Sequence, residues 1–181
     1  MTIKSIFNKI IFRITEKKGT ERLIKRRLEQ LRGTTLVSML TFLDHNKSRE
    51  ELCYLAFIDR LTETYNRNML EEFRKKFDSM DIFVTIIDID NLKIINDTKG
   101  HGEGDLYIKS IADKIKKCSD WTFRLGGDEF LAISRLPIIF EMLGASYGTV
   151  YKPSNLSLNT AMKTADFLMY KNKKPKKGDT K

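Results

Sequence analysis

Residues 122–134 read Thr-Phe-Arg-Leu-Gly-Gly-Asp-Glu-Phe-Leu-Ala-Ile-Ser. Apolar, strand-like residues flank two glycines and two adjacent carboxylates. Glycine permits the positive φ angles of a tight turn and lets another backbone or a ligand approach closely. The stretch therefore predicts a β-hairpin with arms at 122–125 and 130–134. Asp128 and Glu129 lie at its tip, where they suit a metal ion, although the motif taken alone is better explained by a solvated turn.

A second acidic cluster lies at the end of a short apolar run. Residues 81–88 are rich in β-branched and aromatic side chains, which is typical of a buried strand. Asp88 and Asp90 project to the same side if the strand continues through them. In a ferredoxin-like sheet this strand lies beside the hairpin, which brings Asp88 near Asp128 and Glu129. Such carboxylates repel one another unless a cation neutralises them, so the two clusters together indicate a Mg²⁺ or Mn²⁺ site of the kind used in phosphoryl transfer.

The order of the predicted elements indicates an α+β fold. We expect a ferredoxin-like palm domain with an antiparallel central sheet, preceded by N-terminal helices. Helices are predicted at 62–77, 105–117 and 158–171, and a further strand at 143–150. The expected organisation is a basic, amphipathic, helical N-terminal extension at 1–55, a catalytic domain at 56–175 and a basic tail at 176–181.

Charge is distributed unevenly along the 181 residues, whose formal net charge is +9. Residues 1–32 carry 10 Lys+Arg against 3 Asp+Glu, and residues 163–181 carry 7 against 2, whereas residues 33–162 carry 16 against 19. A nucleic-acid-binding domain is expected to carry its basic stripe on the folded body, so this function is disfavoured. We expect a cytoplasmic protein. Residues 2–15 have helical apolar spacing, which predicts contact with a membrane surface, a partner helix or the domain itself.

The segment after the predicted strand carries groups that suit a nucleotide. Lys93 can meet phosphate charge, Asn96 offers both a donor and an acceptor, and Asp105 only accepts hydrogen bonds. A carboxylate that faces the N1–H and N2–H₂ donors of guanine selects against adenine, which lacks that donor pair. His101 taken alone is more often a structural histidine.

Five motifs in order carry a family resemblance across roughly residues 55–175. They are Asp59-x-Leu61-Thr62-x-x-x-Asn66-Arg67, Asp88-Ile-Asp-x-x-Lys93-x-Ile-Asn96-Asp97-x-x-Gly100-His101-x-x-Gly104-Asp105, Arg124-x-Gly-Gly-Asp-Glu-Phe130, Ala145-Ser146-x-Gly148, and Ala165-Asp166-x-x-Met169-Tyr170-x-x-Lys173. The chain resembles a GGDEF-domain diguanylate cyclase in a shortened form. The resemblance implies condensation of two GTP molecules into cyclic di-GMP, with release of two pyrophosphates, at a homodimer in which each subunit holds one GTP.

The resemblance also implies roles for individual residues. Asp88, the Ile89 carbonyl and Asp128 would coordinate Mg²⁺ (or Mn²⁺), with Asp128 and Glu129 as the catalytic pair. Asp128 would activate the attacking 3′-hydroxyl, and Glu129 would support the metal site. The substrate-binding residues would be Asn96 and Asp105 at guanine, His101 in the pocket, Lys93 and Lys173 at the triphosphate, and Gly126 and Gly127 in the hairpin that approaches the nucleotide.

The chain departs from the family pattern at three places. Lys117-x-x-Asp120 stands where the family has an inhibitory product-binding Arg-x-x-Asp, and lysine lacks the bidentate fork of arginine, so product inhibition is expected to be weak or absent. Glu63 stands at a family glycine position, and Leu92 at a phenylalanine position. The nine residues 135–143 replace a full crossover helix, which predicts incomplete cover of one sheet face.

Three other functions remain open at this point. The first is a catalytically impaired module that binds GTP or a cyclic dinucleotide; the shortened crossover favours it and the retained carboxylates oppose it. The second is a palm-type nucleotide cyclase with another product, which Asn96 and Asp105 oppose. The third, binding of nucleic acid through the basic ends, fits least well.

Overall fold

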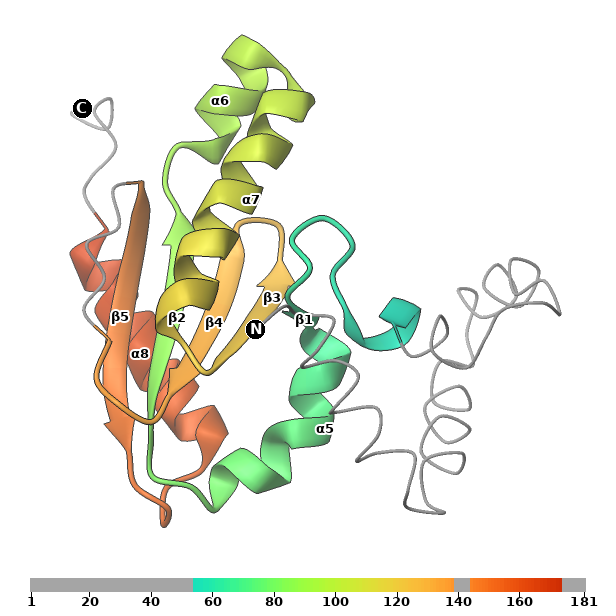
Figure 1. Ribbon diagram of the computed structural model, residues 1–181. Coiled ribbons are helices and arrows are strands. Elements are labelled where there is room, and N and C mark those ends of the chain that lie inside the picture. The colour runs from blue at the N-terminus through green and yellow to red at the C-terminus, as the bar shows by residue number, and fades with distance from the viewer. Residues whose placement is uncertain (1–53, 139–143, 174–181) are drawn as a thin grey trace, which may run out of the picture. The chain divides into compact units, whose positions relative to one another are not determined.

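A five-stranded sheet with strand order β1-β3-β4-β2-β5 forms the centre of the domain (Figure 1). The computed structural model describes residues 54–138 and 144–173. The strands are β1 (Tyr65–Asn66), β2 (Ile82–Ile89), β3 (Trp121–Gly126), β4 (Glu129–Ser134) and β5 (Ala145–Lys152). The helices are α5 (Arg67–Asp78), α6 (Leu92–Lys99), α7 (His101–Cys118) and α8 (Leu158–Asn172).

Strand β2 lies between β4 and β5 and pairs antiparallel with both. Strands β3 and β4 also pair antiparallel, so the four long strands form the antiparallel ferredoxin-like sheet that the sequence predicts. The short β1 adds a parallel pairing to β3, which makes the whole sheet mixed. The register places Asp88 opposite Glu129 on β4 and opposite Ser146 on β5.

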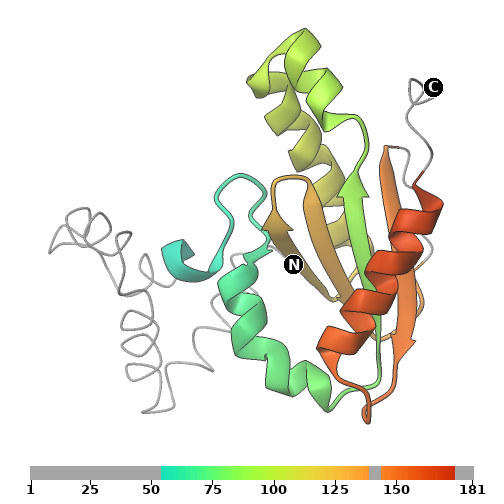
Figure 2. The same cartoon turned by 180° about the vertical axis from the view of Figure 1, so that it is seen from behind.

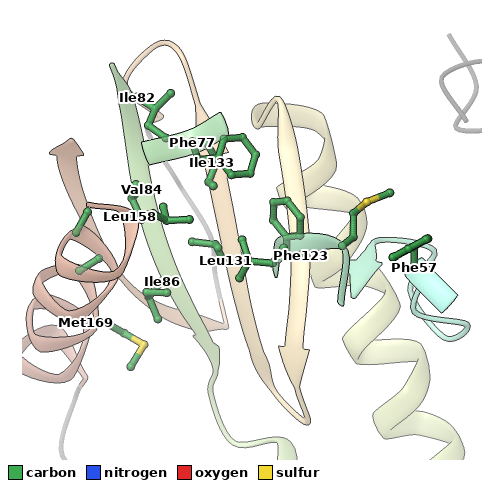
Figure 3. Packing of buried hydrophobic residues seen from close by; sticks show 14 residues of the cluster. Phe57, Phe77, Ile82, Val84, Ile86, Phe123, Leu131, Ile133, Leu158 and Met169 are labelled. Carbon is green, nitrogen blue, oxygen red and sulfur yellow. The ribbon is translucent and has the colours of Figure 1, made fainter. Parts of the chain in front are cut away.

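Helices cover the two faces of the sheet unequally. Helices α5 and α8 lie on one face and α7 lies on the other (Figures 1 and 2). Figure 3 shows the core on the first face, where Phe77 of α5 and Leu158 and Met169 of α8 meet Val84 and Leu131 of the sheet. The second core joins α7 to the opposite side chains of β2, β4 and β5. The α+β architecture is therefore confirmed.

Two helix boundaries differ from the sequence-based expectation. The helix predicted to start at residue 62 starts at Arg67, because the Asn66 side chain accepts hydrogen bonds from the amides of Asn68 and Met69 and caps α5 there. Helix α7 starts at His101, four residues earlier than predicted, because Gly100, with φ +87°, ends α6 and begins α7 directly. Thus one glycine makes a sharp helical hairpin.

The short crossover at 135–143 predicts incomplete cover of the sheet near β5. On the α7 side, the rings of Phe83 and Tyr151 lie 5.3 Å apart, and Tyr151 is 55% exposed. Residues 139–143 lie outside the described ranges, so incomplete cover of this face stays a prediction. The extension at 1–55 (apart from its last two residues) and the tail at 176–181 also lie outside them. Within the described residues, none of the helices has the length and apolarity that a membrane span requires.

Candidate nucleotide and metal site

Asp88 stands at the end of β2, on the sheet face that α5 and α8 cover. Its side chain is only 12% exposed, and Oδ1 accepts a hydrogen bond of 2.8 Å from Nζ of Lys173, which immediately follows α8. A carboxylate taken this far out of water requires a counter-charge or hydrogen-bond donors. Lys173, 85 positions away in the sequence, provides both.

The β3–β4 hairpin is held beside the end of β2 by its main chain. The Ile89 N–H donates to the Asp128 carbonyl at 3.0 Å. At the tip, Gly127 adopts φ +43°, which confirms the predicted turn glycine. The Arg124 guanidinium donates to the Gly127 carbonyl from Nε and Nη2, at 3.1 and 2.7 Å, and from Nη1 to Asp59 at 3.1 Å. Arg124 therefore fixes the tip to the turn that precedes β1.

The negative charges of three carboxylates act on the ammonium group of Lys173. The hydrogen bond to Asp88 is the largest cause that raises the pKa of Lys173, and the negative charges of Asp88, Asp128 and Asp90 raise it further against the opposing effect of burial. Glu129 pairs with Asp88 across β2 and β4, so its side chain lies on the same face, and it is exposed. The structure thus pairs Asp88 with Glu129 and holds the main chain of Asp128 beside the end of β2, while the shared metal site of these residues stays a prediction.

Asp90 is held differently from Asp88. Strand β2 ends at Ile89, so the alternation does not continue through Asp90. The Asp90 carboxylate accepts a 2.7 Å hydrogen bond from Ser146 Oγ. The backbone N–H of Asp90 donates to the Gly144 carbonyl. That carbonyl also accepts from Tyr107 of α7 at 3.1 Å. Asp90 therefore ties the end of β2 to the start of β5.

The donor set suits a hard divalent cation, because carboxylate and carbonyl oxygens are the ligands that Mg²⁺ and Mn²⁺ prefer. Asp88 and the hairpin carboxylates supply negative charge, which one ammonium group partly neutralises. Within residues 54–138 and 144–173, however, three or more His, Cys, Asp or Glu side chains do not gather closely enough to form a metal site. A bound cation would therefore need main-chain, water or substrate oxygens besides the carboxylates.

The proposed guanine-binding residues lie on the α6–α7 hairpin, which projects from the sheet end that also carries the β3–β4 turn (Figure 1). The Asn96 amide packs directly on Gly104, where any Cβ would overlap its Oδ1 atom. Gly104 therefore keeps Asn96 on α6 beside the α7 turn that carries Asp105. Asp105, His101 and Lys93 are exposed on the two helices.

Two features near the site went unrecognised in the sequence. The first is the Arg124–Asp59 ion pair, whose signal was the Asp59-x-Leu61-Thr62 motif. The second is a hollow of about 270 Å³ between the start of α5 and the hairpin, which Arg67, Asn68 and Gly127 help to line. Its lining includes neither Asp88 nor Asp128, so it is separate from the carboxylate cluster.

The segment that departs from the family's inhibitory motif has a structural role. The Asp120 carboxylate accepts the Arg135 backbone N–H at 2.8 Å, which joins the start of β3 to the end of β4. Lys117 is exposed at the end of α7. One of the two side chains of this motif therefore already serves the fold. Weak product inhibition stays a prediction.

Comparisons with known proteins agree on one domain family. The family model described as "Diguanylate cyclase, GGDEF domain" matches residues 56–137. The probable diguanylate cyclase DgcJ of Escherichia coli K12 is 34% identical over 169 residues, which cover 78% of this chain and 33% of DgcJ. The chain thus spans about a third of the length of that relative.

Two solved structures are similar at 25% identity. One is a microbial GGDEF domain described in an interaction with bis-(3′,5′)-cyclic di-GMP, with a TM-score of 0.57 over 65% of this chain and 92% of that one. The other is the GGDEF domain of DgcB from Caulobacter crescentus in complex with c-di-GMP, with a TM-score of 0.54 over 64% of this chain and 86% of that one.

Proposed function

The chain belongs to the GGDEF-domain family, and on that premise we propose that it is a diguanylate cyclase that converts two GTP molecules into cyclic di-GMP. In each of two equivalent steps, a ribose 3′-hydroxyl attacks an α-phosphorus, a 3′–5′ phosphodiester bond forms, and pyrophosphate leaves with the electron pair of the broken bond. Three observations at one end of the sheet support the proposal: Asp88 pairs with Glu129, the Ile89 N–H donates to the Asp128 carbonyl, and Lys173 forms an ion pair with Asp88.

The acidic residues hold the metal and handle the proton. Asp88, the Ile89 carbonyl and Asp128 would hold Mg²⁺ or Mn²⁺, and Glu129, opposite Asp88, would support that site. A bound divalent cation supplies Lewis-acid stabilisation of charge on the phosphate oxygens. Asp128 accepts the proton of the attacking 3′-hydroxyl. The backbone hydrogen bond from Ile89 to Asp128 supports this assignment, because it keeps the hairpin and the strand in register.

The α6–α7 hairpin selects guanine. Asp105 accepts from the N1–H and N2–H₂ donors of guanine, and Asn96 provides a complementary donor and acceptor. His101 lines the nucleotide pocket. The close contact between Asn96 and Gly104 supports the assignment, because it fixes the Asn96 amide in one position next to the turn that bears Asp105.

Positive side chains and glycines accommodate the triphosphate. Lys93 and Lys173 neutralise its charge, and Gly126 and Gly127 let the hairpin backbone approach it. An added Cβ at either glycine would meet nothing within 4 Å, so the surface beside the hairpin is open to a ligand. Because each subunit holds one GTP, the active species is a homodimer with the two nucleotides facing each other.

The test is incubation of the protein with GTP and Mg²⁺, followed by chromatography of the products. We expect cyclic di-GMP and pyrophosphate in a 1:2 ratio. Absence of cyclic di-GMP at high protein concentration would overturn the proposal. An Asp128→Ala variant that works at the unchanged rate would refute the mechanism, and equal competition by ATP would refute the role of Asp105.

A second function has one observation in its favour. The nine residues 135–143 are too few for a full crossover helix, and this favours a catalytically impaired module that binds GTP or a cyclic dinucleotide for signalling. This alternative predicts that the protein binds GTP in equilibrium dialysis but yields no product with either Mg²⁺ or Mn²⁺. Product formation under either condition rules it out.

A further inference from the structure

The ion pair between Lys173 and Asp88 joins a proposed phosphate-binding residue directly to a proposed metal ligand. Nζ lies 2.8 Å from Oδ1, and the side chain of Lys173 is 35% exposed while that of Asp88 is 12% exposed. Among the ion pairs of the described residues, this pair alone involves a proposed ligand of the metal. The two roles cannot both be filled in this arrangement, because Lys173 is bound to the ligand and not to a phosphate.

We propose that Lys173 acts as an exchangeable counter-cation of Asp88. It neutralises the buried carboxylate while no divalent cation is bound, and it moves its ammonium group to the triphosphate when GTP and the divalent cation bind together. The inference rests on the proposed function and adds to it a coupling between metal binding and nucleotide binding.

The surroundings of Lys173 permit this exchange. Its backbone N–H donates to the carbonyls of Met169 and Tyr170, at 2.9 and 3.3 Å, and the side chain of Asn172 donates to the Tyr147 carbonyl at 3.2 Å. The main chain is therefore held at the end of α8. The side chain is partly exposed on a flexible four-carbon stem, and its ammonium group is a point charge that accepts many geometries. Only the side chain has to move.

Competition for Asp88 has a thermodynamic consequence. A divalent cation that binds alone must displace the ammonium group, which then loses its hydrogen-bonded partner Asp88. When a triphosphate is present, the displaced group gains a new one. By linkage, GTP raises the affinity for the metal and the metal raises the affinity for GTP by the same factor. The domain therefore takes up both together in preference to the metal alone.

The experiment measures Mn²⁺ binding to the full chain without nucleotide, from the electron paramagnetic resonance signal of free Mn²⁺. A Lys173→Met variant is expected to bind Mn²⁺ about five-fold more tightly than the wild type, because one partly exposed competing charge is removed. Lys171→Met is the matched control. Lys171 lies in the last turn of α8, two residues before Lys173, and its replacement removes the same charge. Its Nζ, however, lies 4.4 Å from the centre of the Phe167 ring and does not contact Asp88.

The control is expected to change the affinity less than two-fold. Lys173→Arg keeps the charge and is expected to bind Mn²⁺ no more tightly than the wild type. If Lys173→Met binds Mn²⁺ no better than Lys171→Met does, the exchange is overturned. Unfolding curves of all variants establish that each is folded at the temperature of the measurement.

A second arm adds a GTP analogue with a methylene group between the α- and β-phosphates. The analogue is expected to enhance Mn²⁺ binding less in Lys173→Met than in the wild type, and equal enhancement would contradict the coupling. Asp88→Asn separates the two proposals. If it binds Mn²⁺ as well as the wild type does, the metal site of the proposed function is wrong. If it loses Mn²⁺ while Lys173→Met matches the wild type, only the exchange is wrong.

Discussion

Replacement of Gly148 by alanine tests the packing that carries Lys173 to the site. Gly148 lies in β5 under α8, and a Cβ at this position would overlap the Ala165 carbonyl oxygen and the Met169 amide nitrogen. It would also lie 2.8 Å from the Cβ of Leu168. Two of the three obstructing atoms belong to the helix backbone, so no change of rotamer relieves the overlap. Helix α8 must move away from the sheet as a unit.

The cost follows from this geometry. Restoring ordinary non-bonded separations requires a shift of α8 of about 1 Å. A gap of that size already forfeits a quarter to a half of the dispersion energy across it. The contacts at risk include those of Leu158 and Ala161, two residues of α8 that are completely buried against the sheet. Overpacking in cores costs about 1–3 kcal/mol, and we expect the upper end, about 3 kcal/mol, because the obstacle is backbone. For a domain of this size that lowers Tm by roughly 10 °C.

Urea unfolding followed by circular dichroism gives the free energy of unfolding of each variant. Gly102→Ala is the control: Gly102 lies in α7, an added Cβ would meet nothing within 4 Å, and alanine there is expected to stabilise the helix by up to about 1 kcal/mol. Gly148 has no positive φ, so backbone strain does not complicate the comparison. A loss below about 1 kcal/mol in Gly148→Ala would refute the close approach of α8 to β5.

Three further substitutions follow from single observations. Glu63 is exposed with φ +54°, a conformation that costs a side-chain-bearing residue about 1–2 kcal/mol, so Glu63→Gly is expected to stabilise the domain by up to about 1 kcal/mol in urea unfolding, whereas stabilisation by Glu63→Ala would show that the backbone is not the cause. Burial acts to raise the pKa of Asp59, but hydrogen bonds from Thr62 and the charge and hydrogen bond of Arg124 hold it below its usual value. The stability that Asp59 contributes is therefore present above its unfolded-state pKa, about 4, and is lost as the pH falls through the lower folded-state pKa. Asp59→Asn should accordingly lower Tm at pH 7 and differ less from the wild type in melts below pH 4, and a Tm difference independent of pH would contradict this. Gly104→Ala is expected to displace the Asn96 amide and therefore to raise the KM for GTP. An unchanged KM would remove Asn96 from the guanine site.

Local signals in the sequence were sufficient for most elements. The glycine turn and the apolar run at 81–88 predicted the hairpin and β2 closely, because both depend on neighbouring residues and on the alternation of side chains. The early start of α7 was missed because Gly102 and Gly104 are poor helix formers. Gly104 is nevertheless suited to its position, since only a residue without a Cβ leaves room for Asn96. Here a tertiary contact outweighs the local preference.

Residues 62–66, at the start of the domain, also show that local patterns do not predict tertiary contacts. Residues 62–66 were assigned to a helix, whereas Thr62 hydrogen-bonds to Asp59 and Tyr65 starts β1. The pairing of β1 with β3 joins segments that are far apart in the sequence, and no local pattern announces it. The positive φ of Glu63 had no signal beyond the glycine that the family carries at that position.

The amino-acid sequence was sufficient for the acidic clusters, the family and the order of the four long strands, because motif spacing and side-chain alternation are local properties. The direct pairing of Asp88 with Glu129, and the ion pair of Asp88 with Lys173, 85 positions away, became apparent only in the tertiary structure. The tertiary structure also decided that Gly148 must lack a side chain for α8 to lie on β5. These relations arise from strand register and from the packing of a helix on a sheet, and both depend on which distant surfaces exclude water together.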